Sequence, residues 1–249
     1  MKLLFNFFYY IYIIVSSPIL YFIALIILIL TYPFDKKRTV LHKFSIVWAM
    51  LYFWVSPGWK IRYSGKENCK HGKTYVVVSN HQSMLDITIM YKIPTVFRWV
   101  SKREVLKIPF IGWLLALHGD VLIKRGNASS AKAMLKDCKS WLEKKVSIAI
   151  FPEGTRSKDG QVHDFKEGAF LLAKLNKVAI LPVVLNGTFE ATKSSALPVR
   201  QKFDIHILPE ISEEEVAATS IKDMTKRVQD IIAKKHRELA PHLYKENPT

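Results

Sequence analysis

Apolar residues are concentrated at the start of the chain. Between Lys2 and Asp35 no charged residue occurs, and the stretch is rich in Ile, Leu, Phe and Tyr. A second apolar piece, residues 44–57, carries aromatic residues of the kind that favour a membrane–water interface. The pattern predicts a hydrophobic anchor of two helices over residues 1–58, followed by a globular domain over residues 59–249.

The two apolar pieces are short for complete membrane spans. Pro18 is expected to break or kink a helix, which leaves only residues 19–32 behind it, whereas ~20 residues cross the hydrocarbon core. The basic connector at residues 36–43 belongs in the cytosol by the positive-inside rule. Two arrangements remain: the first segment spans and the second lies flat, or both enter the cytoplasmic leaflet as a hairpin, which the short pieces favour. Both predict a cytoplasmic (inner) membrane protein whose globular domain faces the cytoplasm.

After Trp59, short apolar runs alternate with helical patterns. Strands are predicted at residues 74–79, 96–101, 121–124, 147–151, 179–185 and 203–208, the last as an edge strand. Amphipathic helices are predicted at residues 129–144 and 211–239, the second capped by Ser212. Strands interleaved with helices predict a single α/β domain with a largely parallel or mixed sheet flanked by helices.

The net charge of the protein indicates which kinds of molecule it binds. The 249 residues carry a formal net charge of +16, which implies attraction to anionic partners. The apolar N-terminus favours a phospholipid membrane over nucleic acid, and neither zinc-finger nor helix-turn-helix spacing is present. The two cysteines, Cys69 and Cys138, are far apart, so we expect a reducing compartment and no metal site.

The first candidate motif, NHQSMLD at residues 80–86, directly follows the Val-rich predicted strand. Functional groups of α/β sheets gather at the carboxyl ends of strands, and a histidine there can take a proton while a carboxylate orients it. Residues five apart on one helix point ~140° away from each other. His81 and Asp86 therefore meet only if His81 lies in the turn and Asp86 in the first helical turn, with Ser83 as a cap. Alternatively, Asp86 is only an acid at a helix start.

Three further motifs follow other predicted strands or form one. In FPEGTRS, Gly154 permits a tight turn, Thr155 adds a hydroxyl and Arg156 offers a forked phosphate ligand, although an ordinary surface turn has the same composition. GDVLIKR ends in Arg125, which either clamps a phosphate or faces water. ILPVV contains Pro182, which suggests an edge or irregular strand with a structural role or a place along an acyl groove.

Together and in this order, the four motifs resemble those of the glycerolipid acyltransferase family with its His-x4-Asp signature, in particular bacterial 1-acyl-glycerol-3-phosphate acyltransferases. The resemblance covers roughly residues 60–190. The second block departs from the family pattern, with Leu122 and Lys124 where an aromatic and an acid are frequent.

The resemblance implies acyl transfer from an acyl thioester, acyl-CoA or acyl carrier protein, to the sn-2 hydroxyl of lysophosphatidic acid. The product would be phosphatidic acid for phospholipid biosynthesis, made without a metal or bound cofactor. His81 would be the general base and Asp86 would orient it. The implied substrate-binding residues are Lys102, Arg125, Glu153, Gly154, Thr155 and Arg156.

Other functions remain open on the sequence. A sister acyltransferase could act on glycerol 3-phosphate, a lysophosphatidylcholine-like lipid or an ornithine lipid. The absence of a G-x-S-x-G motif argues against a lipid hydrolase. A basic lipid-binding protein without activity would explain the charge but not the motifs after strands. His118, His163 and His206 are expected to be solvated or hydrogen-bonded rather than catalytic.

Overall fold

The computed structural model describes residues 2–124, 128–194 and 196–244. Seven strands form one sheet in the order β1-β7-β6-β2-β5-β3-β4. Their bounds are β1 Trp59–Ser64, β2 Tyr75–Ser79, β3 Phe97–Lys102, β4 Val121–Ile123, β5 Ser147–Ile150, β6 Ala179–Asn186 and β7 Gln201–Ile207. All neighbouring pairs are parallel except β6–β7, which is antiparallel. The prediction of a single α/β domain with a largely parallel or mixed sheet is confirmed.

One expectation about the sheet is wrong, and another is decided between its two alternatives. Residues 203–208 were expected at an edge, but β1 pairs with β7 along its whole length and takes that edge. The alternating exposure of β1 kept its sequence from standing out as an apolar run. Pro182 lies in β6, a fully buried strand between β2 and β7, so the expectation of an edge is wrong. The alternative, an irregular position, is confirmed. The regular β6–β7 pairing begins only at Val183, after Pro182, and the next antiparallel contact before it, between Ile180 and Ile211, is shifted by one residue.

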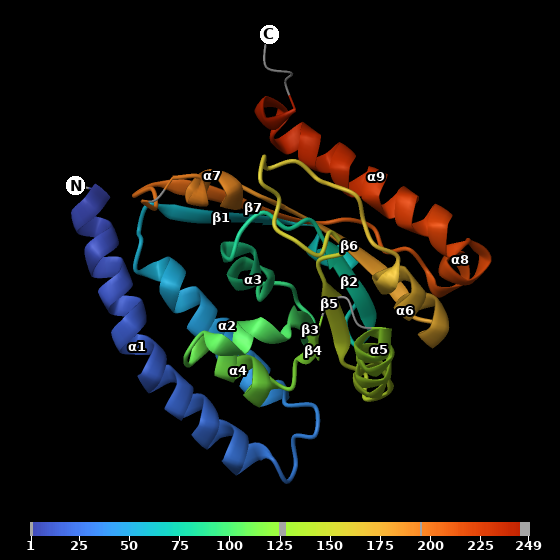
Figure 1. Cartoon of the computed structure of the whole chain (residues 1–249), viewed down its shortest axis with the longest axis horizontal. Coiled ribbons are helices and arrows are strands. Elements are labelled where there is room, and N and C mark those ends of the chain that lie inside the picture. Colours follow the sequence, from blue (N-terminus) through green and yellow to red (C-terminus); the bar gives the residue numbers. More distant parts are fainter. Residues whose placement is uncertain (1, 125–127, 195, 245–249) are drawn as a thin grey trace.

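Helices cover both faces of the sheet (Figure 1). One face carries α5 Ala128–Glu143, α6 Gly168–Asn176, α8 Glu213–Ala218 and α9 Ile221–Leu239. The other face carries α2 Thr39–Trp54 and α3 Leu85–Met90, with α4 Ile111–His118 beside them. Short elements complete the chain: α7 Thr188–Thr192 and the 3-10 turns η1 Lys66–Asn68, η2 Arg103–Lys107 and η3 Pro241–Leu243. Each face has its own apolar core, because successive side chains of a strand point to opposite sides.

The C-terminal helix predicted at residues 211–239 is two helices. Ser212 caps α8 as expected, and its hydroxyl and the Glu215 carboxylate form a reciprocal capping box. The chain then becomes extended at Thr219 and Ser220, and the Ser220 hydroxyl caps α9 by accepting from the Asp223 N–H. A second capping serine inside the amphipathic pattern explains why the pattern did not reveal the break.

The N-terminal region also differs from expectation. Helix α1, Lys2–Thr31, continues unbroken through Pro18, so the apolar start is one long helix and not two short pieces. Among the described residues, α1 is the one helix long and apolar enough to cross a membrane. Its outward side chains are exposed, whereas α2 buries one side in the domain core and so is not a second free membrane helix. The 30-residue α1 lies along α2 and α4 (Figure 1).

Candidate active site

The loop after β2 is fastened to the neighbouring strand β6. The Asn80 side-chain amide donates to the Leu185 carbonyl at 2.9 Å, and its oxygen accepts from the Leu185 N–H at 2.9 Å. Both strands are parallel, so their carboxyl ends lie at one edge of the sheet. Asn80 thus fixes the start of the NHQSMLD motif at that edge.

His81 and Asp86 meet in the way the spacing required. His81 lies in the turn after β2, and Asp86 is in the first turn of α3. His81 Nδ1 is 2.8 Å from Asp86 Oδ2, and that oxygen also accepts from the backbone N–H groups of Gln82 at 2.6 Å and Ser83 at 2.7 Å. The Ser83 hydroxyl accepts from the Leu85 N–H, as a residue that stabilises the helix start. Asp86 therefore does both things that the sequence left as alternatives: it orients a histidine and stabilises a helix start.

The His81 ring is held flat on an aromatic ring. Phe151, the first residue of FPEGTRS, stacks on it with ring centroids 4.0 Å apart and an angle of 8° between the planes. The carboxylate of Asp86 can only accept, so Nδ1 carries the proton and Nε2 of a neutral ring is the free acceptor. Among the described residues Nε2 has no hydrogen-bond partner, and His81 lines a cavity at this edge of the sheet.

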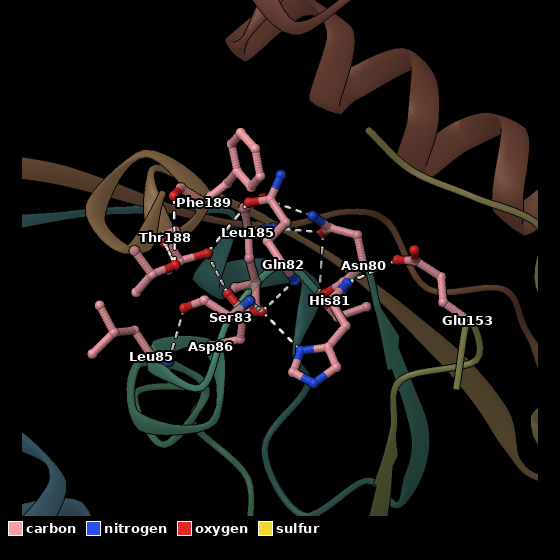
Figure 2. A network of polar contacts seen from close by, with 12 residues as sticks. Asn80, His81, Gln82, Ser83, Leu85, Asp86, Glu153, Leu185, Thr188 and Phe189 are labelled. Atoms are coloured by element: carbon pink, nitrogen blue, oxygen red, sulfur yellow. Dashed lines mark hydrogen bonds and ion pairs between the residues drawn. The ribbon is translucent and has the colours of Figure 1, made fainter. Parts of the chain in front are cut away.

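The FPEGTRS loop is joined to the backbone of His81 on two sides, and Figure 2 shows the side of Glu153. Glu153 Oε1 accepts from the His81 N–H at 2.8 Å, and the Ser157 N–H donates to the His81 carbonyl at 2.8 Å. Gly154 has a φ of 72°, in the left-handed region, which lets the loop turn between these bonds.

Glu153 does not face the cavity, unlike the expectation that it binds substrate. Its second oxygen accepts from the His163 N–H at 3.3 Å, and the side chain is buried. Burial raises the pKa of Glu153 to about 7, although the two N–H donors favour the ionised form. The sequence did not reveal this role, since nothing local shows which way a side chain in a tight turn points.

The cavity has a volume of about 700 Å³ and lies over the carboxyl ends of β2, β3 and β5. Of the expected site residues, His81, Lys102, Gly154, Thr155 and Arg156 line it, and Asp86 lies behind His81. Arg125 lies outside the described residues. The remaining wall is mostly apolar, formed by Met84, Ile87, Trp99, Val105, Ile108, Ile123, Met134, Ile150 and Ala169. No residue of the ILPVV strand lines this cavity, so that strand is structural here.

Four cations line the cavity: Lys102, Lys124, Arg156 and Lys166. All four are exposed, and none forms an ion pair with another described residue. Lys124 was noted in the sequence only as a departure from the family pattern, and Lys166 carried no signal because it belongs to no motif. One carboxylate, Glu104, also lines the cavity, so the cations outnumber the anions by four to one. The cavity therefore joins a histidine, an excess of cations and an apolar wall, an arrangement suited to an anionic amphiphile.

The three other histidines considered in the sequence, His118, His163 and His206, are hydrogen-bonded, as expected. His163 is exposed and contacts Asp159, His206 contacts Ser64, and His118 is buried beside Asp120. Within the described residues, no group of three or more His, Cys, Asp or Glu side chains could hold a metal ion.

The chain belongs to the acyltransferase family, since the family model described as Acyltransferase matches residues 60–186. The chloroplastic 1-acyl-sn-glycerol-3-phosphate acyltransferase LPAT1 of Arabidopsis thaliana is 39% identical over 170 residues, 66% of this chain and 47% of that protein. The 1-acyl-sn-glycerol-3-phosphate acyltransferase of Helicobacter pylori is 32% identical over 167 residues, 66% of this chain and 70% of that protein.

The fold is that of the 1-acyl-sn-glycerophosphate (LPA) acyltransferase PlsC from Thermotoga maritima. Its crystal structure has a TM-score of 0.79 and 22% identity, with 100% of each chain covered. The chain spans about half the length of several of the curated relatives that it matches, including the chloroplastic ones.

Proposed function

We propose that this protein transfers a fatty acyl group from an acyl thioester to the sn-2 hydroxyl of 1-acyl-glycerol-3-phosphate, giving phosphatidic acid. The observation that carries the proposal is the His81–Asp86 pair opening into a cavity lined by cations and an apolar wall. Relatives named 1-acyl-sn-glycerol-3-phosphate acyltransferases support the choice of acceptor.

In the proposed mechanism His81 Nε2 takes the proton of the acceptor hydroxyl as its oxygen attacks the thioester carbonyl. Asp86 keeps the ring oriented and stabilises the imidazolium that forms. The tetrahedral intermediate then expels the thiolate, which takes the proton back from His81, so that the free base is regenerated. The atoms and charges balance without a metal ion or bound cofactor, and coenzyme A or acyl carrier protein serves only as the acyl carrier.

The acceptor phosphate is assigned to the cations of the cavity. Lys102, at the end of β3, and Arg156, in the FPEGTRS loop, are exposed in its lining, which also contains Lys124 and Lys166. Arg125 remains a candidate from its place in the second motif. Gly154 and Thr155 shape this end of the cavity. We assign Glu153 no contact with phosphate, because both its oxygens accept from backbone N–H groups and a carboxylate would repel an anion.

The proposed location is the cytoplasmic (inner) membrane, with the domain on the cytoplasmic side. The exposed apolar side chains of α1 support attachment to a phospholipid membrane. The basic connector between α1 and α2 and the need for cytosolic acyl donors support the orientation.

The test is acyl transfer to 1-acyl-glycerol-3-phosphate from labelled acyl-CoA and acyl carrier protein, using membranes that contain the protein. Replacing His81 by alanine should lower the rate by ~10²–10⁴-fold, the usual contribution of a general base. Membrane binding should be unchanged, since His81 lies in the cavity and not on α1.

Each other result has a definite reading. Full activity in His81→Ala would refute the role of His81 as general base, whereas the assignment of the reaction would stand. Product only with lysophosphatidylcholine, glycerol 3-phosphate or a lyso-ornithine lipid would keep the reaction class and change the acceptor. No product with any acceptor and either donor would refute the enzyme and favour a lipid-binding role.

A further inference from the structure

The second oxygen of the Asp86 carboxylate contacts Thr188, a residue in none of the four motifs. Thr188 Oγ1 is 2.5 Å from Asp86 Oδ1, and both side chains are fully buried. Its other polar neighbour is Gln82 Oε1 at 3.3 Å. Figure 2 shows the Asp86 carboxylate between the Thr188 side chain and the His81 ring.

The direction of the Thr188 hydrogen bond follows from its neighbours. Gln82 Nε2 lies 2.6 Å from the carbonyl oxygen of Gly160, a fixed acceptor, so the amide nitrogen must face that way. The amide oxygen of Gln82 then faces Thr188. With an amide oxygen on one side and a carboxylate oxygen on the other, the Thr188 hydroxyl can only donate, and Asp86 is the closer acceptor.

The orientation of Gln82 is fixed from the C-terminal helix. Gln82 Nε2 is 2.8 Å from Nε2 of His236 in α9, and His236 Nδ1 is 2.8 Å from the Tyr244 hydroxyl. Burial lowers the pKa of His236 to about 4, so near neutral pH the ring is uncharged and its Nε2 accepts from the Gln82 amide. Each polar group in this series of hydrogen bonds, from Tyr244 to Thr188, therefore has a defined role as donor or acceptor. The series ends at the Asp86 carboxylate.

The backbone before Thr188 accounts for its placement. Gly187, directly after β6, has a φ of 88°, and a Cβ there would lie 2.1 Å from the Lys202 carbonyl oxygen. This turn directs the chain back so that Thr188 begins α7 at the carboxyl end of β6, next to that of β2. Two neighbouring parallel strands thus deliver His81 and Thr188 to one edge.

We propose that Thr188 is a positioning residue for the His81–Asp86 pair, its hydroxyl binding the carboxylate oxygen that His81 leaves free. Both oxygens of Asp86 are then occupied, and the carboxylate cannot rotate away from the ring. The hydroxyl also stabilises the ionised carboxylate and weakens its pull on the His81 proton. Residues beyond the matched segment 60–186 would thereby set the geometry and basicity of the catalytic base.

The test compares Thr188→Val with Thr188→Ser in the transfer assay. Valine keeps the shape and removes the donor, so kcat should fall roughly 10- to 100-fold at unchanged KM for both substrates, because His81 is misplaced but the binding surface is intact. The acid limb of the kcat/KM profile should move to higher pH, because a carboxylate that has lost its hydroxyl donor holds the His81 proton more strongly. Serine should restore both.

Two controls separate positioning from packing. Thr192→Val alters the same helix, where the hydroxyl bonds only backbone carbonyls, and Thr225→Val removes a buried threonine hydroxyl that also bonds a backbone carbonyl, far from Asp86. Both should keep the parent profile. If Thr188→Val does not fold, Thr188→Ala, which cannot overpack, takes its place.

Three results of the transfer assay would overturn the proposal: a folded Thr188→Val with the parent kcat and pH profile, a Thr188→Ser as impaired as the valine, or equal losses in the controls. The proposal rests on the proposed function, so a readout without substrate distinguishes the two failures. The pH dependence of His81 modification by diethyl pyrocarbonate, followed by peptide mass spectrometry, should move upward in Thr188→Val even if the parent transfers nothing. An unmoved profile there also overturns the proposal.

Discussion

Among the described residues, two histidines are paired with a fully buried aspartate, and only one of these pairs lies at the cavity. His81 Nδ1 is 2.8 Å from Asp86, and His118 Nδ1 is 3.0 Å from Asp120. Both carboxylates are fully buried and both also accept from backbone N–H groups. By the distance between ring and carboxylate alone, the two pairs would be judged equivalent.

They differ at the other ring nitrogen. The His81 side chain is 13% exposed and its Nε2 faces the cavity, whereas His118 is 0% exposed. Nε2 of His118 lies 3.2 Å from His42 Nδ1 and 3.2 Å from an Arg98 nitrogen. A histidine can take a proton from a substrate only where a substrate can reach it, so access, and not pairing, distinguishes the candidate base.

The second pair instead belongs to a junction between the N-terminal helices and the domain. Arg98 donates to the Lys37 carbonyl and Arg38 donates to the Leu117 carbonyl, so each side of the junction binds the other's backbone. Arg98 also lies over the Trp141 ring, 4.6 Å from its centroid. The same residue types thus prepare a reaction in one place and join two parts of the chain in the other.

The different roles of the two pairs are tested most directly by removing the charge of each aspartate. Asp86→Asn should lower kcat by ~10²–10⁴-fold with a small change in stability, because an amide no longer enforces the tautomer that leaves Nε2 free. The measurement is the transfer rate beside the thermal midpoint of the same preparation. A loss of stability with a normal rate per folded molecule would reverse the assignment of the two pairs.

The matching change in the second pair should lower the stability of the protein and leave the transfer rate per folded molecule almost unchanged. Asp120→Asn leaves the buried Arg98, whose pKa burial lowers to about 10, without its nearby carboxylate. Removing one partner of a direct buried ion pair costs roughly 3–5 kcal/mol. Asp120 acts on Arg98 from nearby and its direct partners are His118 and the Trp99 N–H, so the loss here should reach at most that value. Denaturant unfolding in detergent should show that loss, while the rate per folded molecule stays within a few-fold of the parent. A stable but inactive variant would contradict the structural role.

A smaller effect is expected from pH, through His236. Its pKa in the folded protein is about 4, below the value of 6.5 in the unfolded chain, so the unfolded chain binds the proton first as pH falls. Stability contributed by His236 is present above pH 6.5 and is lost as pH falls toward 4, by about 3 kcal/mol. His236→Gln should therefore show a shallower loss over that window than the parent.

The exposed His71 gives the control for this slope. His71→Gln should leave the slope of stability against pH unchanged between pH 6.5 and 4. Glu153 acts in the opposite sense, because its raised pKa of about 7 makes stability fall as pH rises from 4.5 through 7. The difference between parent and His236→Gln at each pH cancels that contribution, and equal slopes would show that His236 is not buried uncharged.

Local chemistry in the sequence predicted the centre of the site. The meeting of His81 and Asp86 followed from helix geometry and a capping serine, all within seven residues. Functional groups of α/β sheets gather at the carboxyl ends of strands. Thr188 could have been found from this rule, because it follows β6, which is parallel to β2. It was missed because strand order is a property of the whole sheet, and no local pattern states which strand lies beside which.

The errors in the fold have the same origin. The expectation that residues 203–208 form an edge failed because β1 pairs there from 142 positions away, as with Arg62 and Asp204. The expected break at Pro18 failed because one missing hydrogen bond is outweighed along a helix that packs against α2 and α4. The local sequence correctly indicated a strand at residues 203–208 and an unfavourable helix position at Pro18. In both cases tertiary contacts then decided the final arrangement.

The stacking of His81 on Phe151 has an entropic consequence. A free histidine side chain samples several rotamers, whereas this ring is fixed at its edge by a carboxylate and on its face by an aromatic ring. That loss of freedom occurs when the protein folds, so it enters the free energy of folding and not the activation free energy of acyl transfer. The base is therefore already ordered when the acceptor arrives.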